Sequence, residues 1–191
     1  MSHSISVISV SLVLVSLMLV SCSQKKNEAA YSVFERSFCA QVTVKNADGE
    51  YRASVTLKGI QTFDTTNTDD NSSEGVAGVR DGNIVYTYPD SVTGISAVRR
   101  GSTVTVNVSG IDVVPSENIA AKYTFLLDLL DLRSDEVCSE STAEIEGVAA
   151  VLLTYKYGEQ ELVVAIDRVS KKPMYLSYGD TTVSFDSFIY I

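Results

Sequence analysis

The chain has 191 residues and a mass of 20.7 kDa, which is enough for one domain with a substantial core. Hydrophobic residues make up 45 % and charged residues 20 %, a balance typical of a globular protein and unlike that of a disordered one. The formal net charge of −9 would repel phosphate backbones, so we expect no nucleic-acid partner.

The residue types present also limit the kinds of catalysis and metal binding that we expect. The only histidine is His3, in an apolar N-terminal stretch, so the rest of the chain has no imidazole for Ser-His-Asp or Cys-His catalysis or for a His-ligated zinc site. No glycine motif for phosphates or dinucleotides is present. We therefore expect no catalytic residue, no cofactor, no metal and no enzymatic activity. Hydrolysis by a pair of carboxylates is the one enzymatic alternative that the composition leaves open.

Residues 1–21 have the features of an export signal. They contain no Lys, Arg, Asp or Glu, and an apolar run extends from Ile5 to Val20. As a helix this run would span about 24 Å, which is short of the ~30 Å hydrocarbon core of a bilayer. This length favours a secretory signal, although the missing positive charge before Ile5 departs from such signals. An uncleaved anchor helix is the alternative.

The residues that follow, Leu19-Val20-Ser21-Cys22, resemble the lipobox of bacterial lipoproteins. In that motif the cysteine receives a diacylglycerol thioether and becomes the first residue after cleavage. We therefore expect a signal peptide over residues 1–21, a tether over 22–26 and one domain over 27–191. Acyl chains on Cys22 would hold that domain on the extracytoplasmic face of the cell membrane or outer membrane.

The first elements of the expected domain are one helix and a series of strands. Asn27 is a suitable cap for an N-terminal helix, with apolar residues at helical spacing up to Phe38. From Ala40 the period changes to two, which predicts strands with one buried face, as in residues 51–57 and 103–108. Tight turns would join these strands into antiparallel hairpins. The turns are predicted at Asp48-Gly49, Asp81-Gly82, Arg100-Gly101, Tyr157-Gly158 and Gly179-Asp180.

Two segments interrupt this pattern. Gln61 to Gly75 is polar and reads as a loop, and Ser116 to Leu132 reads as one long helix that begins after Pro115. The predicted apolar face of that helix consists of Ile119, Tyr123, Leu126, Leu127 and Leu130. The later runs 148–153 and 162–166 are continuously apolar, which predicts strands covered on both faces.

Together these elements predict an α+β domain with a strongly curved antiparallel sheet. The sheet would form a half-open barrel, with an N-terminal helix and a mid-chain helix on its concave face. Cys39 and Cys138 would both lie in this exported domain, where such a pair favours a disulfide. Two free thiols are the alternative.

The order of elements resembles the LolA/LolB-like lipoprotein carriers. Two stretches carry most of the resemblance: residues 83–110, with a Pro-containing turn and a hairpin that ends in glycine, and residues 163–175, with Asp167 and Pro173 six apart. The resemblance implies a half-open barrel whose concave face and helical lid can enclose acyl chains. It implies no catalytic residue, because roles in this superfamily depend on the cavity.

We therefore expect a membrane-anchored lipoprotein that binds a lipid or another apolar ligand in the curved sheet. The alternative is a non-enzymatic interaction module that positions or regulates an enzyme of the cell envelope. In this alternative the predicted lining residues pack only against one another. The candidate lining residues are Tyr51, Val55, Leu57, Tyr86, Val106, Tyr123, Leu126, Leu127 and Leu130.

Overall fold

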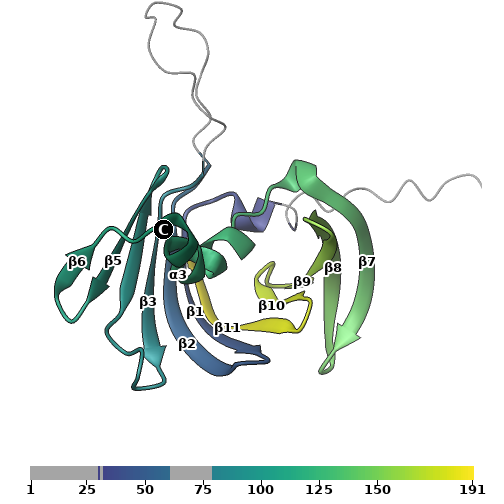
Figure 1. Ribbon diagram of the computed structural model, residues 1–191. Coiled ribbons are helices and arrows are strands. Elements are labelled where there is room, and N and C mark those ends of the chain that lie inside the picture. The colour runs from purple at the N-terminus through teal and green to yellow at the C-terminus, as the bar shows by residue number, and fades with distance from the viewer. Residues whose placement is uncertain (1–29, 31, 61–78) are drawn as a thin grey trace, which may run out of the picture.

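The computed structural model describes residue 30 and residues 32–60 and 79–191 (Figure 1). The predicted signal peptide, the tether, Cys22, the first residues of the predicted N-terminal helix and the Gln61–Gly75 loop lie outside these described residues. No helix among the described residues is long and apolar enough to cross a membrane.

Eleven strands of the described residues form a single sheet, and every neighbouring pair is antiparallel. The order across the sheet is β6-β5-β4-β3-β2-β1-β11-β10-β9-β8-β7. Two meanders, β1 to β6 and β7 to β11, therefore meet where β1 pairs with β11. The strands are β1 (Phe38–Asn46), β2 (Gly49–Leu57), β3 (Gly82–Tyr88), β4 (Ser96–Arg100), β5 (Thr103–Val108), β6 (Ile111–Val113), β7 (Val137–Ile145), β8 (Val148–Tyr157), β9 (Gln160–Asp167), β10 (Pro173–Tyr178) and β11 (Thr181–Tyr190).

Figure 1 shows the sheet bent into an open U, which we call the trough. Strands β3 to β6 form one wall, β7 to β9 form the other, and the strands between them form the floor. The helix α3 (Glu117–Leu129) lies inside the trough and contacts β3, β4 and β5. The predicted curved antiparallel sheet with a mid-chain helix on its concave face is therefore confirmed.

The predicted N-terminal helix differs from the structure over the described residues. A short 3₁₀ helix, η1 (Ser32–Phe34), is followed by β1, which begins at Phe38. Phe38 pairs with Leu57 on one side and with Tyr190 on the other. Tertiary pairing with two strands thus overrides the helical spacing that the sequence shows around this residue.

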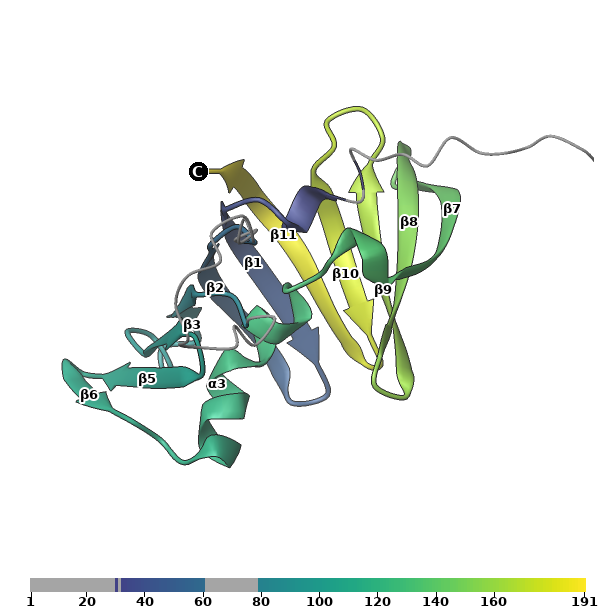
Figure 2. The ribbon, with the colours of Figure 1, turned by 90° about the horizontal axis from the view of Figure 1, so that it is seen from above.

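The mid-chain helix is three residues shorter at its C-terminal end than the predicted range, which extended to Leu132. Ser116 occupies the N-cap position without a side-chain hydrogen bond, and a second 3₁₀ helix, η2 (Ser134–Glu136), leads into β7. Ile119 was assigned to the buried face, but its side chain is 49 % exposed. The buried residues of α3, Thr124, Leu126, Leu127 and Leu129, all lie in its C-terminal half, and Figure 2 shows its first turns at the edge of the sheet.

Most predicted turns occur where expected, because Gly49, Gly101, Gly158 and Gly179 all have positive φ. The Asp81-Gly82 prediction is wrong. Gly82 is the first residue of β3, pairs with Leu57 and does not have a positive φ. A Cβ added there would lie 2.8 Å from Leu57 Cδ1 and 3.1 Å from Leu127 Cδ2. Glycine is therefore required by the close approach of helix and sheet and not by a turn.

The apolar strands β8 and β9 are buried mainly through their inner face. Val151 and Leu153 of β8 and Val164 and Ile166 of β9 belong to the same core cluster as the leucines of α3. The outward-facing residues of these strands are small or half-buried, and Figure 1 shows no described element layered over them. The predicted covering of both faces is thus observed only on the inner face.

Candidate functional site

The nine predicted lining residues come together on the concave side of the trough. All of them belong to one hydrophobic cluster or pack against it. The aliphatic members are 3 % exposed or less, and only Tyr51, Tyr86 and Tyr123 are partly exposed. Because α3 rests directly on β3, β4 and β5, these aliphatic side chains fill the space between the helix and that wall. These side chains therefore form the surface on which α3 packs, which we call the seat of the helix.

The end of the trough that bears the β1–β2, β8–β9 and β10–β11 hairpin turns carries partly exposed aromatic rings, and we call it the tyrosine end. The ring centroids of Tyr51 and Tyr86 are 5.7 Å apart, and those of Tyr86 and Tyr123 are 6.4 Å apart. Tyr86 Oη donates a hydrogen bond to the Tyr123 carbonyl at 3.2 Å. Burial raises the pKa of both Tyr51 and Tyr86, so these phenols stay neutral at physiological pH.

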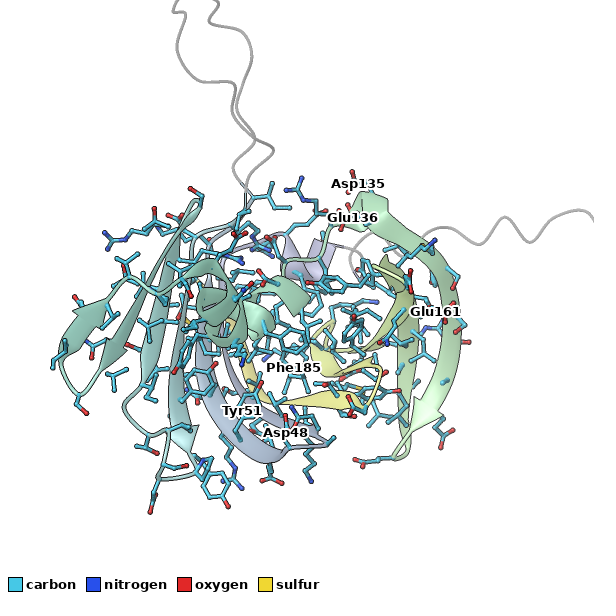
Figure 3. The ribbon with its side chains drawn as sticks, viewed as in Figure 1. Asp48, Tyr51, Asp135, Glu136, Glu161 and Phe185 are labelled. Atoms are coloured by element: carbon cyan, nitrogen blue, oxygen red, sulfur yellow. The ribbon has the colours of Figure 1, made fainter. Side chains whose placement is uncertain are left out.

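The tyrosine end also includes aromatic residues on the other side of α3. Phe125 of the helix contacts Tyr178 of β10, with centroids 6.3 Å apart, and Tyr178 contacts Tyr157 of β8 at 5.2 Å. All three rings are partly exposed, as is Phe185 of β11, whose ring centroid lies 6.0 Å from those of Phe34 and Phe188, between this flank and the opposite end of the trough. Figure 3 shows Phe185 inside the trough, below α3 and above the floor. This flank of the helix therefore presents aromatic surface that the chain itself does not fully cover.

A groove separates the C-terminal part of α3 from β8. It has a volume of about 410 Å³ and is lined by Val79, Asp128, Asp131, Leu132, Glu136, Tyr155, Lys156, Tyr157 and Gly158. Its lining combines apolar side chains with the acidic Asp128, Asp131 and Glu136 and the basic Lys156. A molecule with an apolar tail and a polar head would match this distribution.

The opposite end of the trough is sealed, and we call it the phenylalanine end. Phe34, Phe38 and Phe188 are 3 % exposed or less. Phe38 stacks on Phe188 with centroids 4.8 Å apart, and Phe34 packs edge-on against both rings. Aromatic pairs in these arrangements add to the free energy of folding beyond the area that they bury.

Two buried arginines attach helix α3 to neighbouring parts of the trough. Arg99 pairs with Asp128 and Asp131, the latter with 3.6 Å between Arg99 Nη2 and Asp131 Oδ2. Arg80 lies 3.7 Å from Asp131, and it donates hydrogen bonds to the carbonyls of Phe34, Lys58 and Arg36. The end of α3 is thereby tied to β4, to η1 and to the residues after β2.

This role of Arg99 was not predicted from the sequence. Only Arg100 is exposed, whereas Arg99 is 3 % exposed. The period of two in β4 contained the signal: Ala97 faces inward, so Arg99 must also face inward. An inward-facing arginine needs a carboxylate partner, and the helix supplies it.

Asp128 and Asp131 are also the carboxyl pair that a hydrolytic enzyme would require, because both line the same groove. Burial raises the pKa of Asp128, and the charge of Arg99 opposes that rise. Both carboxylates, however, are engaged by arginine. Their arrangement is therefore explained by the attachment of the helix.

The predicted disulfide is absent from the structure, in which Cys39 and Cys138 are both free thiols. Cys39 lies on β1 and its sulfur is 3.3 Å from Thr56 Oγ1. Cys138 lies on the edge strand β7, and β11, β10, β9 and β8 separate these two strands in the sheet. Among the described residues, no group of His, Cys, Asp and Glu has an arrangement that could hold a metal ion.

Comparisons of sequence find no relative: no family model matches the chain, and no curated protein matches it. Comparison of structures does find similar folds. An uncharacterised conserved protein from Thermus thermophilus is 11 % identical, with a TM-score of 0.52, and the match covers 86 % of this chain and 84 % of that protein.

Two further solved structures are more distant. A LolA superfamily protein from Nitrosomonas europaea is 11 % identical, with a TM-score of 0.41 and coverage of 86 % and 91 %. The lipoprotein LppX from Mycobacterium tuberculosis is 13 % identical, with a TM-score of 0.39 and coverage of 84 % and 89 %. The likeness to the Thermus thermophilus protein shows a shared fold.

Proposed function

We propose that this protein is an extracytoplasmic lipoprotein, anchored through Cys22, that binds one apolar chain in its trough. The ligand lies between α3 and strands β8 to β11, on the flank opposite the seat of the helix. Its tail contacts Phe125, Tyr178 and Phe185, and its polar head lies at the rim of the groove beside β8.

One observation carries this proposal: the two flanks of α3 differ in how completely they are covered. On the flank that faces β3 to β5, Leu126 and Leu127 are 1 % exposed or less. On the other flank, the rings of Phe125, Tyr157 and Tyr178 face the inside of the trough and remain partly exposed. Uncovered aromatic surface inside a concave site is typical of a ligand-binding pocket.

The chain contains no Trp, so a single introduced indole can locate the ligand. Tyr178 and Tyr175 lie on the same strand but on opposite faces, since Leu176 belongs to the core. We expect a brominated fatty acid to quench the fluorescence of the Tyr178→Trp variant and to leave the matched Tyr175→Trp variant unchanged. Equal quenching of both variants, or quenching of neither, contradicts the proposed site.

The anchor is tested separately by labelling cells with radioactive palmitate. We expect the label on the wild-type protein and its loss in the Cys22→Ser variant. A labelled Cys22→Ser variant, or an unlabelled wild type, would contradict lipidation at this residue.

A second function, as an interaction module for an envelope enzyme, is favoured by the edge of the sheet. Strand β7 has a partner on one side only, and its exposed residues are Ser, Thr, Glu and Cys. Such an edge can accept a strand from another protein. Crosslinking in membranes should then capture one specific protein with the wild type and lose it in the Ser139→Lys/Ser141→Lys variant, whose charges block strand addition. Retention in that variant speaks against this function.

A further inference from the structure

The end of the trough that carries η1 differs in charge from the rest of this acidic protein. The loop between β9 and β10 has the sequence Arg168-Val169-Ser170-Lys171-Lys172. Arg36, which precedes β1, is exposed and lies over the ring of Tyr190 with 4.4 Å between Cζ and the centroid. Figure 2 shows η1, this loop and the end of β11 at one end of the molecule, opposite the hairpin turns of the tyrosine end. We call this region the basic end.

Hydrophobic side chains project from the same end. Val169 is 87 % exposed, the highest value among the exposed large hydrophobic residues of the described chain. Ile189 of β11 is 61 % exposed. Basic residues that surround exposed aliphatic side chains form a surface suited to the interface of an anionic bilayer.

The β9–β10 loop is held in a defined shape by Asp167. The Asp167 carboxylate accepts hydrogen bonds from the Val169 backbone N–H at 2.8 Å and from Ser170 Oγ at 2.6 Å. The backbone N–H of Arg168 donates to the Ala149 carbonyl at 2.9 Å, which fixes the loop to β8. These hydrogen bonds give the loop a defined conformation, which places Val169 at its tip.

The acidic residues nearest to this surface in the fold are Glu35, which precedes Arg36, Glu144 and Glu146 at the adjacent β7–β8 hairpin, and Asp167, which is engaged within the loop. The tyrosine end is more acidic. Its turns and strand ends carry Asp48, Glu50, Asp90, Glu159, Glu161 and Asp180, against Lys45, Arg52 and Lys156. An anionic surface would attract the first end and repel the second.

The position of the anchor agrees with this polarity. Ala30 is the first described residue and lies two positions before the start of η1 at Ser32. The chain from Cys22 to Ala30 can span at most about 28 Å, so a lipid anchor at Cys22 keeps this end of the domain near the bilayer.

We propose that the basic end is a membrane-docking surface for anionic phospholipid, with Val169 inserted at the interface, so that the tyrosine end points away from the bilayer. This inference rests on the anchor of the proposed function and is independent of the ligand. It assigns the trough an orientation: the proposed ligand site opens toward the space beyond the membrane.

The test uses the full chain with its anchor, purified from membranes and reconstituted into vesicles of phosphatidylethanolamine and phosphatidylglycerol that contain a brominated phospholipid. Two variants each carry the only indole of the chain: Val169→Trp at the basic end and Tyr88→Trp at the tyrosine end. Both sites are exposed, so both variants should fold. We expect quenching of Val169→Trp and none of Tyr88→Trp.

The charge dependence is tested in the Val169→Trp background. A Lys or Arg near an anionic surface contributes about fivefold to binding, so Arg168→Glu/Lys172→Glu should lose most of the quenching. The matched variant Lys45→Glu/Lys156→Glu should retain it. Vesicles of phosphatidylcholine should give weak quenching with every variant.

Each other result overturns a defined part of the inference. Protein that stays in solution overturns the anchor. Anchored protein with an unquenched Val169→Trp indole, or with equal quenching at both positions, overturns the docking surface and assigns the basic end to solvent or to a protein partner. Neither result affects the Tyr178→Trp test, which needs no membrane.

Discussion

The phenylalanine end and the tyrosine end close the same trough with different aromatic residues. At the first, the rings of Phe34, Phe38 and Phe188 pack on one another and are almost completely buried. At the second, the rings of Tyr51, Tyr86 and Tyr178 are partly exposed. A phenol can rest at the border between water and an apolar interior, whereas a buried phenyl ring contributes mainly to packing. The difference indicates that one end stabilises the fold and the other is available for binding.

The strongest test of this division compares one ring from each end. We expect Phe38→Ala to lower the free energy of unfolding by about 3–5 kcal/mol, because it removes a fully buried ring from a packed cluster. Tyr178→Ala should cost less stability, since its ring is only half-buried, but should weaken retention of a fatty acid. Denaturant unfolding and fatty-acid titration measure the two effects. Equal loss of stability at both positions would remove the distinction.

The attachment of α3 to the sheet can be disrupted without substituting a residue of either aromatic cluster. We expect Arg99→Ala to lower the free energy of unfolding by about 2–3 kcal/mol, since it leaves Asp128 and Asp131 without their shared partner and part of that loss is screened by solvent. The matched control is the exposed neighbour Arg100, whose replacement by alanine should change stability by at most about 0.5 kcal/mol. Urea denaturation of both variants checks the prediction.

The seat of the helix can be tested at Gly82. We expect Gly82→Ala to cost about 1–3 kcal/mol, because the added methyl group would press on Leu57 and Leu127. Gly110→Asn is the control: no atom lies within 4 Å of a Cβ there, and asparagine tolerates its positive φ. If thermal melting shows the same change in both variants, the helix is not in close contact with β3.

The smallest effect is expected in the β9–β10 loop. Hydrogen bonds from Ser170 and from the Val169 backbone N–H hold the pKa of Asp167 below its usual value. The ionised carboxylate therefore stabilises the loop above the ordinary pKa of aspartate, and this contribution is lost as the pH falls through the lowered pKa of the folded state. At neutral pH we expect Asp167→Asn to speed amide hydrogen exchange at Val169 and to leave global stability unchanged. Unaltered exchange would show that the carboxylate does not hold the loop.

The sequence predicted the strands of the sheet well, but it did not predict the residues that contact the helix. Alternation of apolar residues located strands such as β2 and β5, because a strand with one buried face has a strict period of two. Applied to β4, the same rule implies that Arg99 faces inward, but its partners Asp128 and Asp131 depend on how the helix lies across the sheet, which no local pattern encodes.

The candidate lining residues likewise show that local sequence patterns do not encode tertiary contacts. Leu126 and Leu127 were correctly assigned to the inner face of the helix, yet they are packed against β3 to β5. The partly exposed flank consists of Phe125, Tyr157, Tyr178 and Phe185, which come from elements far apart in the sequence. Only the curvature of the sheet brings them together. Phe38 likewise matched a helical spacing, until pairing with β2 and β11 gave it a strand conformation.

The pairing of β1 with β11 has a consequence for assembly. The second strand partner of Phe38–Asn46 is Thr181–Tyr190, which is synthesised long after it. Until that segment emerges, one side of β1 exposes unpaired N–H and C=O groups in the middle of the future sheet. Contacts so distant in the sequence form slowly, so we expect a long-lived, chaperone-dependent intermediate with the first meander preformed. A chain that lacks the ten residues Thr181–Tyr190 would stop there and be prone to aggregation.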